Sequence, residues 1–177
     1  MRHISEGRIS QEEFLTLQQA VKPIENCKDL IINDTQVYIN DLANLLRKEK
    51  ESKNIRVVVI DYLGLIKNKK TFENRNSEVS YISRELKVIA KELDISIICL
   101  SQLSRAPMKE ENRLPILTDL RDSGQIEADA EIVMLLHEPD QKQFPKKLII
   151  NVAKNRYGST GELHFTFDKY IGKISDE

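Results

Sequence analysis

Two short runs of the chain, 57–60 and 95–100, are apolar almost without interruption. A strand exposed on one face alternates apolar and polar residues, whereas a strand covered on both faces is apolar throughout. Both runs are rich in Val and Ile, which favour strands. The segment between them carries apolar residues at helical spacing up to about Leu93, namely Val79, Ile82, Leu86, Ile89, Ala90 and Leu93. Strand, crossover helix and strand form a βαβ unit, so the pattern predicts a parallel sheet.

Two further segments predict helices before the first strand. Residues 10–21 begin with Ser10 and carry Glu13 three positions later, which is the capping-box signature of a helix start. Residues 40–51 place three leucines on one face and begin with Asn40, a favourable N-cap residue. We therefore expect two amphipathic helices ahead of the βαβ unit.

The remaining apolar segments predict short strands. Residues 30–34 form an apolar run that ends in Asn-Asp, and 131–136 predict a third long strand. Residues 147–154 and 161–168 flank the turn sequence NRYGST, which favours an antiparallel hairpin. Thr118 is the predicted cap of a turn that leads into the third strand.

The composition is that of an ordinary globular protein. Of the 177 residues, 40% are hydrophobic and 31% are charged, and 27 basic against 28 acidic residues leave a formal net charge of −1. This length is typical of one domain with a sizeable core. Net charge gives no argument for a nucleic-acid partner, so any basic surface has to be local.

Cysteine, histidine and hydropathy patterns exclude several classes of protein. Cys27 and Cys99 form no CxxC pair, the three histidines have no zinc-binding spacing, and Cys99 is expected to be a buried thiol. The lack of a disulfide framework suits a reducing compartment. The sequence has no membrane-spanning stretch and no apolar signal-peptide core near its start. We therefore expect a cytoplasmic protein without a membrane partner.

Both predicted parallel strands are followed by polar residues, Asp61 after the first and Gln102 after the second. Ligands of open α/β sheets bind at the carboxyl ends of the strands. An aspartate there can orient hydrated Mg²⁺ beside a nucleotide phosphate, and a glutamine can contact a phosphate oxygen or a water. Taken singly, each residue is better explained without a ligand, Asp61 as a turn-forming residue and Gln102 as a polar strand end.

Residues 118–131 contain a polar, flexible stretch made of Arg121, Asp122, Ser123 and Gly124. A glycine between polar residues lets backbone N–H groups approach an anion closely, as in a nucleic-acid phosphate site. A solvated junction between a helix and a loop explains the same stretch about as well.

Two basic clusters are further candidates for anion binding. Lys154 and Arg156 are two apart at a strand end and therefore share a face, where two cations without a nearby acid repel each other unless an anion binds. The loop 67–77 contains Lys69, Lys70 and Arg75 around Phe72, a mixture that suits single-stranded nucleic acid. A solvated hairpin tip and a solvated lysine loop are the ordinary alternatives.

Taken together and in this order, these segments resemble the C-terminal motor domain of DnaB-type replicative DNA helicases. VVVIDYLGLI is similar to the Walker B segment, ELKVIAKELDISIICLSQLSR to the sensor helix and strand, and AKNRYGSTGELHFTF to the trans-acting finger hairpin. DLRDSGQIEADA is the most specific match, to the DNA-facing motif. The resemblance implies a RecA-like fold: a mostly parallel sheet with helices on both faces and a C-terminal antiparallel hairpin, over residues 1–177.

The resemblance also implies roles for individual residues. Asp61 would be the Walker B carboxylate that holds Mg²⁺ through ATP, and Gln102 the γ-phosphate sensor. Lys154 and Arg156 would reach the ATP of the neighbouring subunit. Arg121, Asp122 and Gly124 would lie along the DNA backbone, although the family usually has Glu where this chain has Asp122. Lys69, Lys70 and Arg75 are the further candidates for DNA contact.

One feature of the family is missing from these 177 residues: there is no GxxxxGK[ST] sequence. In the family, the P-loop and the following catalytic glutamate lie upstream of the point that matches Met1. The amino-terminal, primase-interacting domain is absent as well. We therefore expect a partial RecA-like motor domain, from Walker B onward, that is inactive alone and leaves an open apolar edge at Val57–Ile60.

The resemblance implies an ATP- and Mg²⁺-dependent helicase that translocates 5′ to 3′ on single-stranded DNA during replication, as a homohexamer with primase and a helicase loader as partners. The alternatives are a non-catalytic remnant, or a plasmid- or phage-borne replication protein that acts as a DNA-binding or ring-interaction module. Another RecA-like ATPase, such as a recombinase, is a weaker alternative because DLRDSGQIEADA argues against it.

Overall fold

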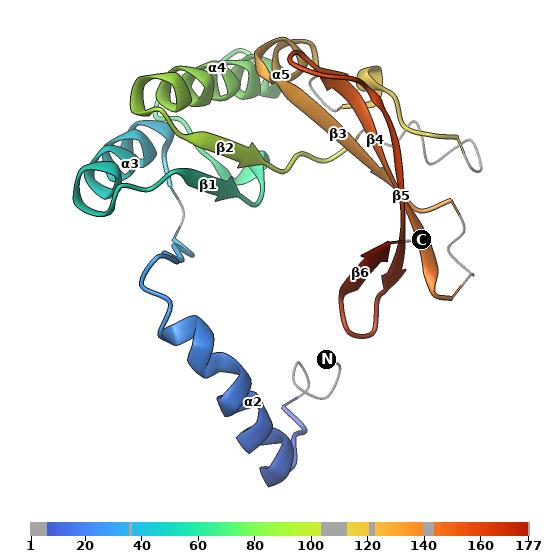
Figure 1. The fold of residues 1–177 in the computed structure, drawn as a ribbon. Coiled ribbons are helices and arrows are strands. Elements are labelled where there is room, and N and C mark those ends of the chain that lie inside the picture. The colour runs from blue at the N-terminus through green and yellow to red at the C-terminus, as the bar shows by residue number, and fades with distance from the viewer. Residues whose placement is uncertain (1–6, 36, 104–112, 121–122, 140–143, 177) are drawn as a thin grey trace. The chain divides into compact units, whose positions relative to one another are not determined.

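The computed structural model describes residues 7–35, 37–103, 113–120, 123–139 and 144–176 (Figure 1). The chain divides into two compact units, residues 1–35 and residues 36–177, and each is described here by itself. Within the described parts, no helix combines the length and the apolar character that crossing a membrane requires.

The first unit consists of helix α2 (Gln11–Glu25) and the segment that follows it. The predicted capping box is confirmed: the backbone N–H of Ser10 donates to Glu13 Oε2 at 2.7 Å, and the N–H of Glu13 donates to Ser10 Oγ at 3.2 Å. The helix continues four residues beyond the predicted end and includes Pro23 in its last turns. No residue of α2 is buried.

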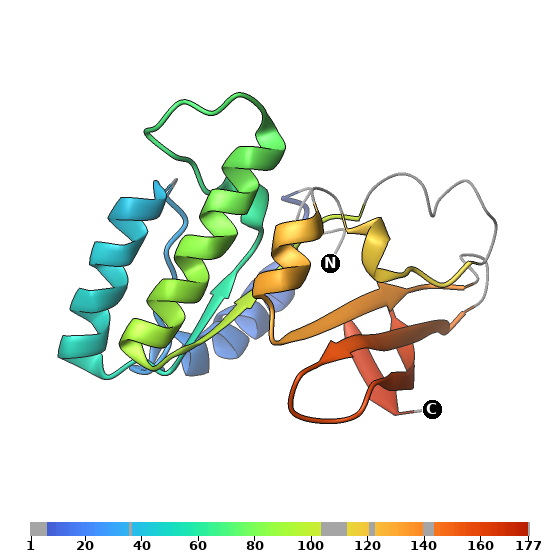
Figure 2. The same cartoon turned by 90° about the horizontal axis from the view of Figure 1, so that it is seen from above.

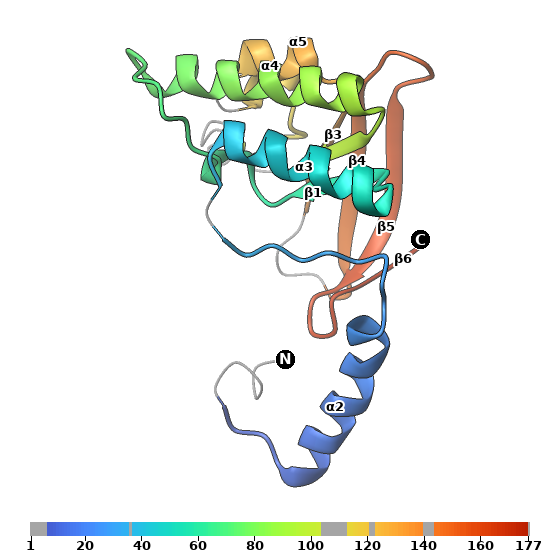
Figure 3. The ribbon, with the colours of Figure 1, turned by 90° about the vertical axis from the view of Figure 1, so that its left-hand side faces the viewer.

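The prediction of a strand at 30–34 is wrong, because this segment has no regular structure (Figure 3). A strand needs a neighbouring strand to pair its N–H and C=O groups, and none pairs with it in the described part of the chain. Its apolar side chains are exposed, with Leu30 at 50% and Ile32 at 75% of their full surface.

The second unit contains the predicted βαβ arrangement. Strand β1 (Val57–Ile60) leads through the short 3₁₀ helix η1 (Leu63–Leu65) to helix α4 (Arg75–Leu93) and then to strand β2 (Ser96–Cys99). The two strands are parallel neighbours, with Val57 beside Ser96 and Ile60 beside Cys99. Helix α4 begins after Asn74, which is its N-cap and accepts from the Ser77 N–H at 2.9 Å.

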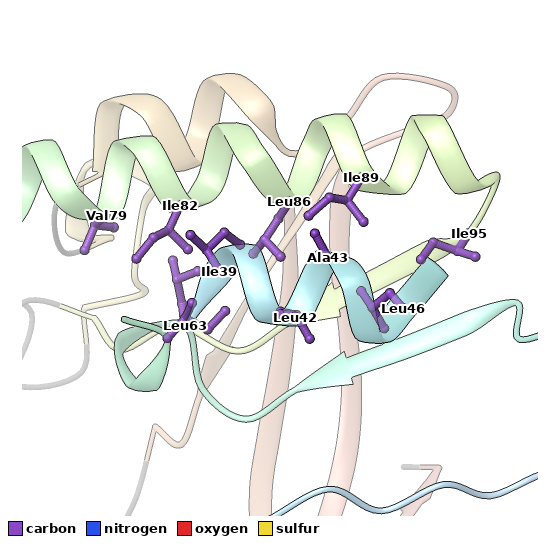
Figure 4. Close-up of a cluster of buried hydrophobic side chains, with 11 residues drawn as sticks. Ile39, Leu42, Ala43, Leu46, Leu63, Val79, Ile82, Leu86, Ile89 and Ile95 are labelled. Carbon is purple, nitrogen blue, oxygen red and sulfur yellow. The ribbon is translucent and has the colours of Figure 1, made fainter. Parts of the chain in front are cut away.

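Helix α3 (Ile39–Lys53) lies beside α4, and both helices cover the same side of β1 and β2 (Figure 2). Asn40 is inside α3 and is not its cap. A tertiary hydrogen bond takes the place of a side-chain cap, since the Ile39 N–H donates to the Lys67 carbonyl at 2.9 Å. The core is formed between these helices and the strands (Figure 4), from Ile39, Leu42, Ala43, Leu46, Leu63, Ile66, Val79, Ile82, Leu86, Ile89 and Ile95.

The opposite side of β1 and β2 is not covered by helices of this unit within the described residues. Val59 is 62% exposed and Ile98 is 55% exposed, although both lie in apolar runs that predict burial on two faces. Cys99 is also exposed, which contradicts the predicted buried thiol, although partial desolvation of its sulfur raises the pKa of the thiol to about 11. Among the described residues, helices therefore cover one face of the parallel strands, and the apolar side chains of the other face are exposed.

The C-terminal part is a larger antiparallel sheet than the predicted hairpin. Its order is β3-β4-β5-β6, all antiparallel: β3 (Ile132–His137), β4 (Lys146–Asn155), β5 (Gly161–Asp168) and β6 (Lys173–Asp176). The predicted strand at 131–136 corresponds to β3, which pairs with β4. Strand β6 was missed because its short sequence, KISD, has only one apolar residue.

Two short helical elements precede β3, namely the 3₁₀ helix η3 (Leu117–Asp119) and the helix α5 (Ser123–Asp129). Thr118 lies inside η3 and is not a cap. The N-cap is Ile116. The carboxylate of Asp119 accepts from the Ile116 N–H and from Arg113 Nη2, each at 2.8 Å. The Arg113 hydrogen bond is the main reason why the pKa of the buried Asp119 lies below its ordinary value.

Candidate functional site

Asp61 and Gln102 follow the carboxyl ends of the two parallel strands. The register places Ile60 beside Cys99, so both side chains come from the same end of the sheet. Two hydrogen bonds tie these strand ends together: Leu100 N–H donates to the Ile60 carbonyl at 3.0 Å, and Leu63 N–H donates to the Leu100 carbonyl at 2.9 Å. Asp61 and Gln102 are both exposed and can therefore meet a ligand outside the sheet.

The residues at this edge fit Mg²⁺ that arrives with a nucleotide. Among the described residues, no three His, Cys, Asp or Glu side chains form a metal-binding group. Mg²⁺ usually keeps several waters and takes one or two protein carboxylates together with substrate phosphates. The single carboxylate of Asp61 is sufficient for that type of coordination.

Lys154 and Arg156 lie together at the end of β4 and point toward the end of α5. Lys154 Nζ donates to the Glu127 carbonyl, and Arg156 Nη2 donates to the Ala128 carbonyl at 2.8 Å. The end of a helix carries unpaired carbonyls and a partial negative charge, which attract cations. The structure thus confirms that the two cations are neighbours.

The assumption that these cations have no nearby acid is wrong. Glu131, the residue before β3, places its Oε2 atom 3.3 Å from Arg156 Nε, and its Oε1 atom pairs with Lys87 of α4. The sequence did not suggest this partner because Glu131 and Arg156 are far apart along the chain. The antiparallel pairing of β3 with β4 brings them together, since Ile132 lies beside Asn155.

The same end of α5 is anchored on α4 by Asp129. This buried carboxylate accepts from Ser83 Oγ at 3.0 Å and from Arg84 Nη1 at 3.1 Å. Burial raises the pKa of Asp129, but hydrogen bonds from neighbouring side chains, first from Gln125, outweigh burial and lower it below its ordinary value. Asp129 therefore remains a carboxylate at neutral pH and holds α5 against α4.

The basic loop residues make contacts of their own within the second unit. Lys69 Nζ lies 3.1 Å from Asp41 Oδ2. Lys70 Nζ is 3.3 Å from the Tyr81 hydroxyl and lies over its ring. These lysines are at the surface, but part of their charge is already paired.

Arg75 was predicted in the loop but is the first residue of α4. It pairs with Glu78 at 2.6 Å and donates to the Gly64 carbonyl at 2.8 Å. Phe72 stacks against Tyr81, with ring centroids 5.5 Å apart. The aromatic residue of the loop therefore packs within the protein.

The predicted DNA-facing stretch is only partly within the described residues. Arg121 and Asp122 lie outside them. Gly124 is exposed in the first turn of α5, and no atom lies within 4 Å of the place where a side chain would begin. The surface beside Gly124 is open, which leaves room for a ligand backbone.

A shallow pocket lined by Thr118, Val152 and Glu162, among others, contains none of the predicted site residues.

The whole chain is similar to helicase sequences. Residues 1–176 match the family model described as DnaB-like helicase C terminal domain. A "Probable plasmid replicative DNA helicase" of Chlamydia trachomatis serovar L2 is 39% identical over 172 residues, which is 97% of this chain and 37% of the relative. The "Replicative DNA helicase DnaB" of Geobacillus stearothermophilus is 35% identical over 178 residues, 98% of this chain and 39% of the relative. The chain thus spans less than two fifths of these curated relatives.

Solved structures give the same result. A structure described as an ATPase domain superposes with a TM-score of 0.87 at 32% identity and covers 99% of this chain and 65% of that one. A structure entitled "The Structure Of A DnaB-Like Replicative Helicase And Its Interactions With Primase" has a TM-score of 0.83 at 32% identity, covering 96% of this chain and 42% of that one. A KaiC-like protein from Pyrococcus horikoshii, at 16% identity and a TM-score of 0.53, shares the RecA-like fold.

Proposed function

The chain belongs to the family of DnaB-like helicase C-terminal domains, and from this premise we propose that it forms the carboxyl part of the motor of a replicative DNA helicase. In this proposal, the motor converts ATP hydrolysis into 5′ to 3′ translocation on single-stranded DNA. The observation that carries the proposal is that the Asp61 and Gln102 positions share one end of the parallel sheet, next to the two bonds that tie the strand ends.

Each residue at the strand ends has a chemical task in this proposal. Asp61 would hold hydrated Mg²⁺ beside the nucleotide phosphates, where the ion would supply positive charge. Gln102 donates its amide N–H to the γ-phosphate or to the attacking water, and so distinguishes ATP from ADP. The negative charge of Asp61 and the neutral amide of Gln102 suit these two different partners.

Lys154 and Arg156 act on the ATP site of a neighbouring subunit of a homohexameric ring. A guanidinium can bind two phosphate oxygens in a fork, while an ammonium acts as a point charge. Such a finger stabilises the charge of the transition state and completes an ATP site only where two subunits meet.

DNA passes the surface formed by Arg121, Asp122 and Gly124, with Lys69, Lys70 and Arg75 as further contacts. Primase and a helicase loader are the expected protein partners of the complete ring.

The phosphate-cradling backbone of the site has to come from elsewhere, because this sequence contains no GxxxxGK[ST]. The side chains of Val57, Val59 and Ile98 are exposed, although apolar sheet faces are normally covered. This exposure is a physical reason to expect a further segment against the face. We propose that a segment with the P-loop packs there.

The second candidate function is a DNA-binding or ring-interaction module without catalysis, as in a remnant or a plasmid-borne protein. The similarity to probable plasmid replicative helicases, at 39% identity, supports the plasmid-borne form of this candidate. In this case, the exposed sheet face and the finger hairpin would serve only to join a ring built from other subunits.

A titration with Mg²⁺-ATP separates the two candidates. The gene product that contains this chain, including any in-frame sequence upstream of the Met1 codon, should bind Mg²⁺-ATP and hydrolyse it faster with single-stranded DNA. The Asp61→Asn variant should lose Mg²⁺-dependent hydrolysis, because a neutral amide no longer attracts the hydrated cation. A gene product without Mg²⁺-ATP affinity would refute the motor and support the binding module.

Binding of single-stranded DNA should depend steeply on salt, because lysines that contact phosphates release counterions. For the Lys69→Ala/Lys70→Ala double variant, we expect the slope of log K against log salt to fall by about 1.4, at roughly 0.7 for each phosphate contact on a single strand. Fluorescence anisotropy at several salt concentrations measures this slope. The Lys28→Ala/Lys48→Ala variant carries the same charge change outside the loop and should keep the parent slope. An unchanged slope in the loop variant would exclude these lysines from the DNA interface.

A further inference from the structure

The carboxylate of Glu131 contacts two cations from two different elements. Its Oε2 atom is 3.3 Å from Arg156 Nε, and its Oε1 atom pairs with Lys87 Nζ. The backbone of the same residue is also engaged, since the Arg156 N–H donates to the Glu131 carbonyl at 3.0 Å. Glu131 therefore holds Arg156 at both its main chain and its side chain.

These contacts orient the guanidinium and leave most of it available. Glu131 Oε2 lies 3.3 Å from Arg156 Nε as an ion pair without a hydrogen bond, and the Ala128 carbonyl accepts one N–H of Nη2 at 2.8 Å. A guanidinium has five N–H donors in a rigid fork, so the others remain for an anion. The Arg156 side chain is still 50% exposed. A bound, partly exposed guanidinium of known direction is what a phosphate-binding finger requires.

Glu131 also offsets a concentration of positive charge. Lys87, Lys154 and Arg156 meet at the end of α5, and the pKa of Lys87 is lowered by burial and then by repulsion from Arg156. Asp129 faces this group as well, but its hydrogen bonds go to Ser83 and Arg84. Glu131 is thus the carboxylate, among the described residues, that contacts the finger arginine directly.

We propose that Glu131 is the positioning residue of the finger: it holds the Arg156 guanidinium in the orientation that reaches the phosphates of the neighbouring subunit's ATP. This inference rests on the proposed function, because it assumes that Arg156 acts on ATP. Glu131 itself does not touch the nucleotide. Its effect is to reduce the number of orientations among which a flexible arginine would otherwise be distributed.

The test measures ATP hydrolysis by the complete helicase subunit with Glu131→Gln. The amide has nearly the shape of the carboxylate but lacks its charge, so Arg156 should lose its fixed direction. We expect kcat to fall by about tenfold to a hundredfold, the order of loss caused by small displacements of catalytic groups, with an unchanged KM for ATP. Glu131→Asp, which keeps the charge, should recover part of kcat. Glu49→Gln breaks a comparable ion pair, Glu49–Lys53, in α3 and should keep the parent kcat.

A double-mutant cycle separates this inference from the proposed function. In an Arg156→Ala background, Glu131→Gln should cause no further loss of kcat, because the residue that it positions is already gone. If Arg156→Ala itself leaves hydrolysis intact, the finger role in the proposed function is wrong. If Arg156→Ala abolishes hydrolysis but Glu131→Gln keeps the parent kcat, only the positioning role is wrong.

A second measurement needs only the chain itself. The nitrogen-15 chemical shift of Arg156 Nε should change in Glu131→Gln, because the charged Oε2 atom of Glu131 lies 3.3 Å from it in the parent chain. In Glu49→Gln this chemical shift should not change. An identical chemical shift in the parent chain and in Glu131→Gln would overturn the proposal without any nucleotide present.

Discussion

Replacing Arg156 with alanine should reduce ATP hydrolysis by the complete helicase subunit about 10³- to 10⁵-fold, the range of losses known for arginine fingers. Alanine cannot supply the forked N–H donors that stabilise the transferring phosphate. Nucleotide binding should change little, because in the proposed function the finger would act from the neighbouring subunit, whereas the P-loop and Asp61 would hold ATP in their own subunit. Steady-state hydrolysis and equilibrium binding of a fluorescent ATP analogue measure the two quantities separately.

Two further variants make this result specific. Arg47→Ala removes another surface arginine, which pairs with Glu92 at 2.8 Å on the helical side of the core, and should leave hydrolysis unchanged. Mixing Arg156→Ala subunits with Asp61→Asn subunits should restore some activity, because each defect affects a different side of a shared site. Intact hydrolysis in Arg156→Ala would show that the hairpin is not a finger. A loss of ATP binding in the same variant would mean that Arg156 serves its own subunit.

Replacing Ile82 with alanine should lower the free energy of unfolding of the chain by about 2–5 kcal/mol, since truncation of a buried isoleucine leaves a cavity. Ile82 has no exposed surface and lies at the centre of the cluster between α3, α4 and the parallel strands (Figure 4). Domains of this size are stable by only about 5–15 kcal/mol, so the loss is a large part of the total. Urea denaturation followed by circular dichroism measures it.

Val88 in the same helix provides the matched control. It is 50% exposed, and its replacement with alanine should change the free energy of unfolding by less than about 0.5 kcal/mol, as is usual for surface positions. Similar destabilisation by both variants would mean that Ile82 and Val88 do not lie on the buried and the exposed face of α4, respectively. The comparison therefore tests the packing on which the positions of Asp61 and Gln102 depend.

The local pattern of the sequence was sufficient to predict the helices and strands in most of the second unit. The spacing of Val79, Ile82, Leu86 and Ile89 predicted the buried face of α4, and the apolar runs predicted β1 and β2 as parallel neighbours. These features follow from the periodicity of the apolar residues and from the strand–helix–strand order, which are both properties of contiguous residues. The Ser10 and Glu13 capping box was predictable for the same reason.

The errors occurred where the outcome depends on distant residues. The segment 30–34 has the residues of a strand but no strand to pair with among the described ones. Asn40 is a good cap residue, but the Lys67 carbonyl binds the helix start one residue earlier. In each case a tertiary contact, or its absence, outweighed the local preference.

The candidate site shows the same difference between features that contiguous residues predict and features that depend on distant residues. Asp61 and Gln102 could be placed from the ends of two apolar runs, whereas Glu131 and Asp129 could not be connected to Arg156 or Arg84 without the fold. Separation along the chain hides such ion pairs from any pattern search. The motif around Arg121 was recognisable only through its resemblance to a family, and the side chains of Arg121 and Asp122 lie outside the described residues.

Strand β1 is hydrogen-bonded to a neighbour on one side only within the described residues, since its sheet contains just β1 and β2. A strand can be added to such an edge by another polypeptide without a covalent link. Any strand that pairs with this edge would make the same main-chain hydrogen bonds to β1, whichever polypeptide it belongs to.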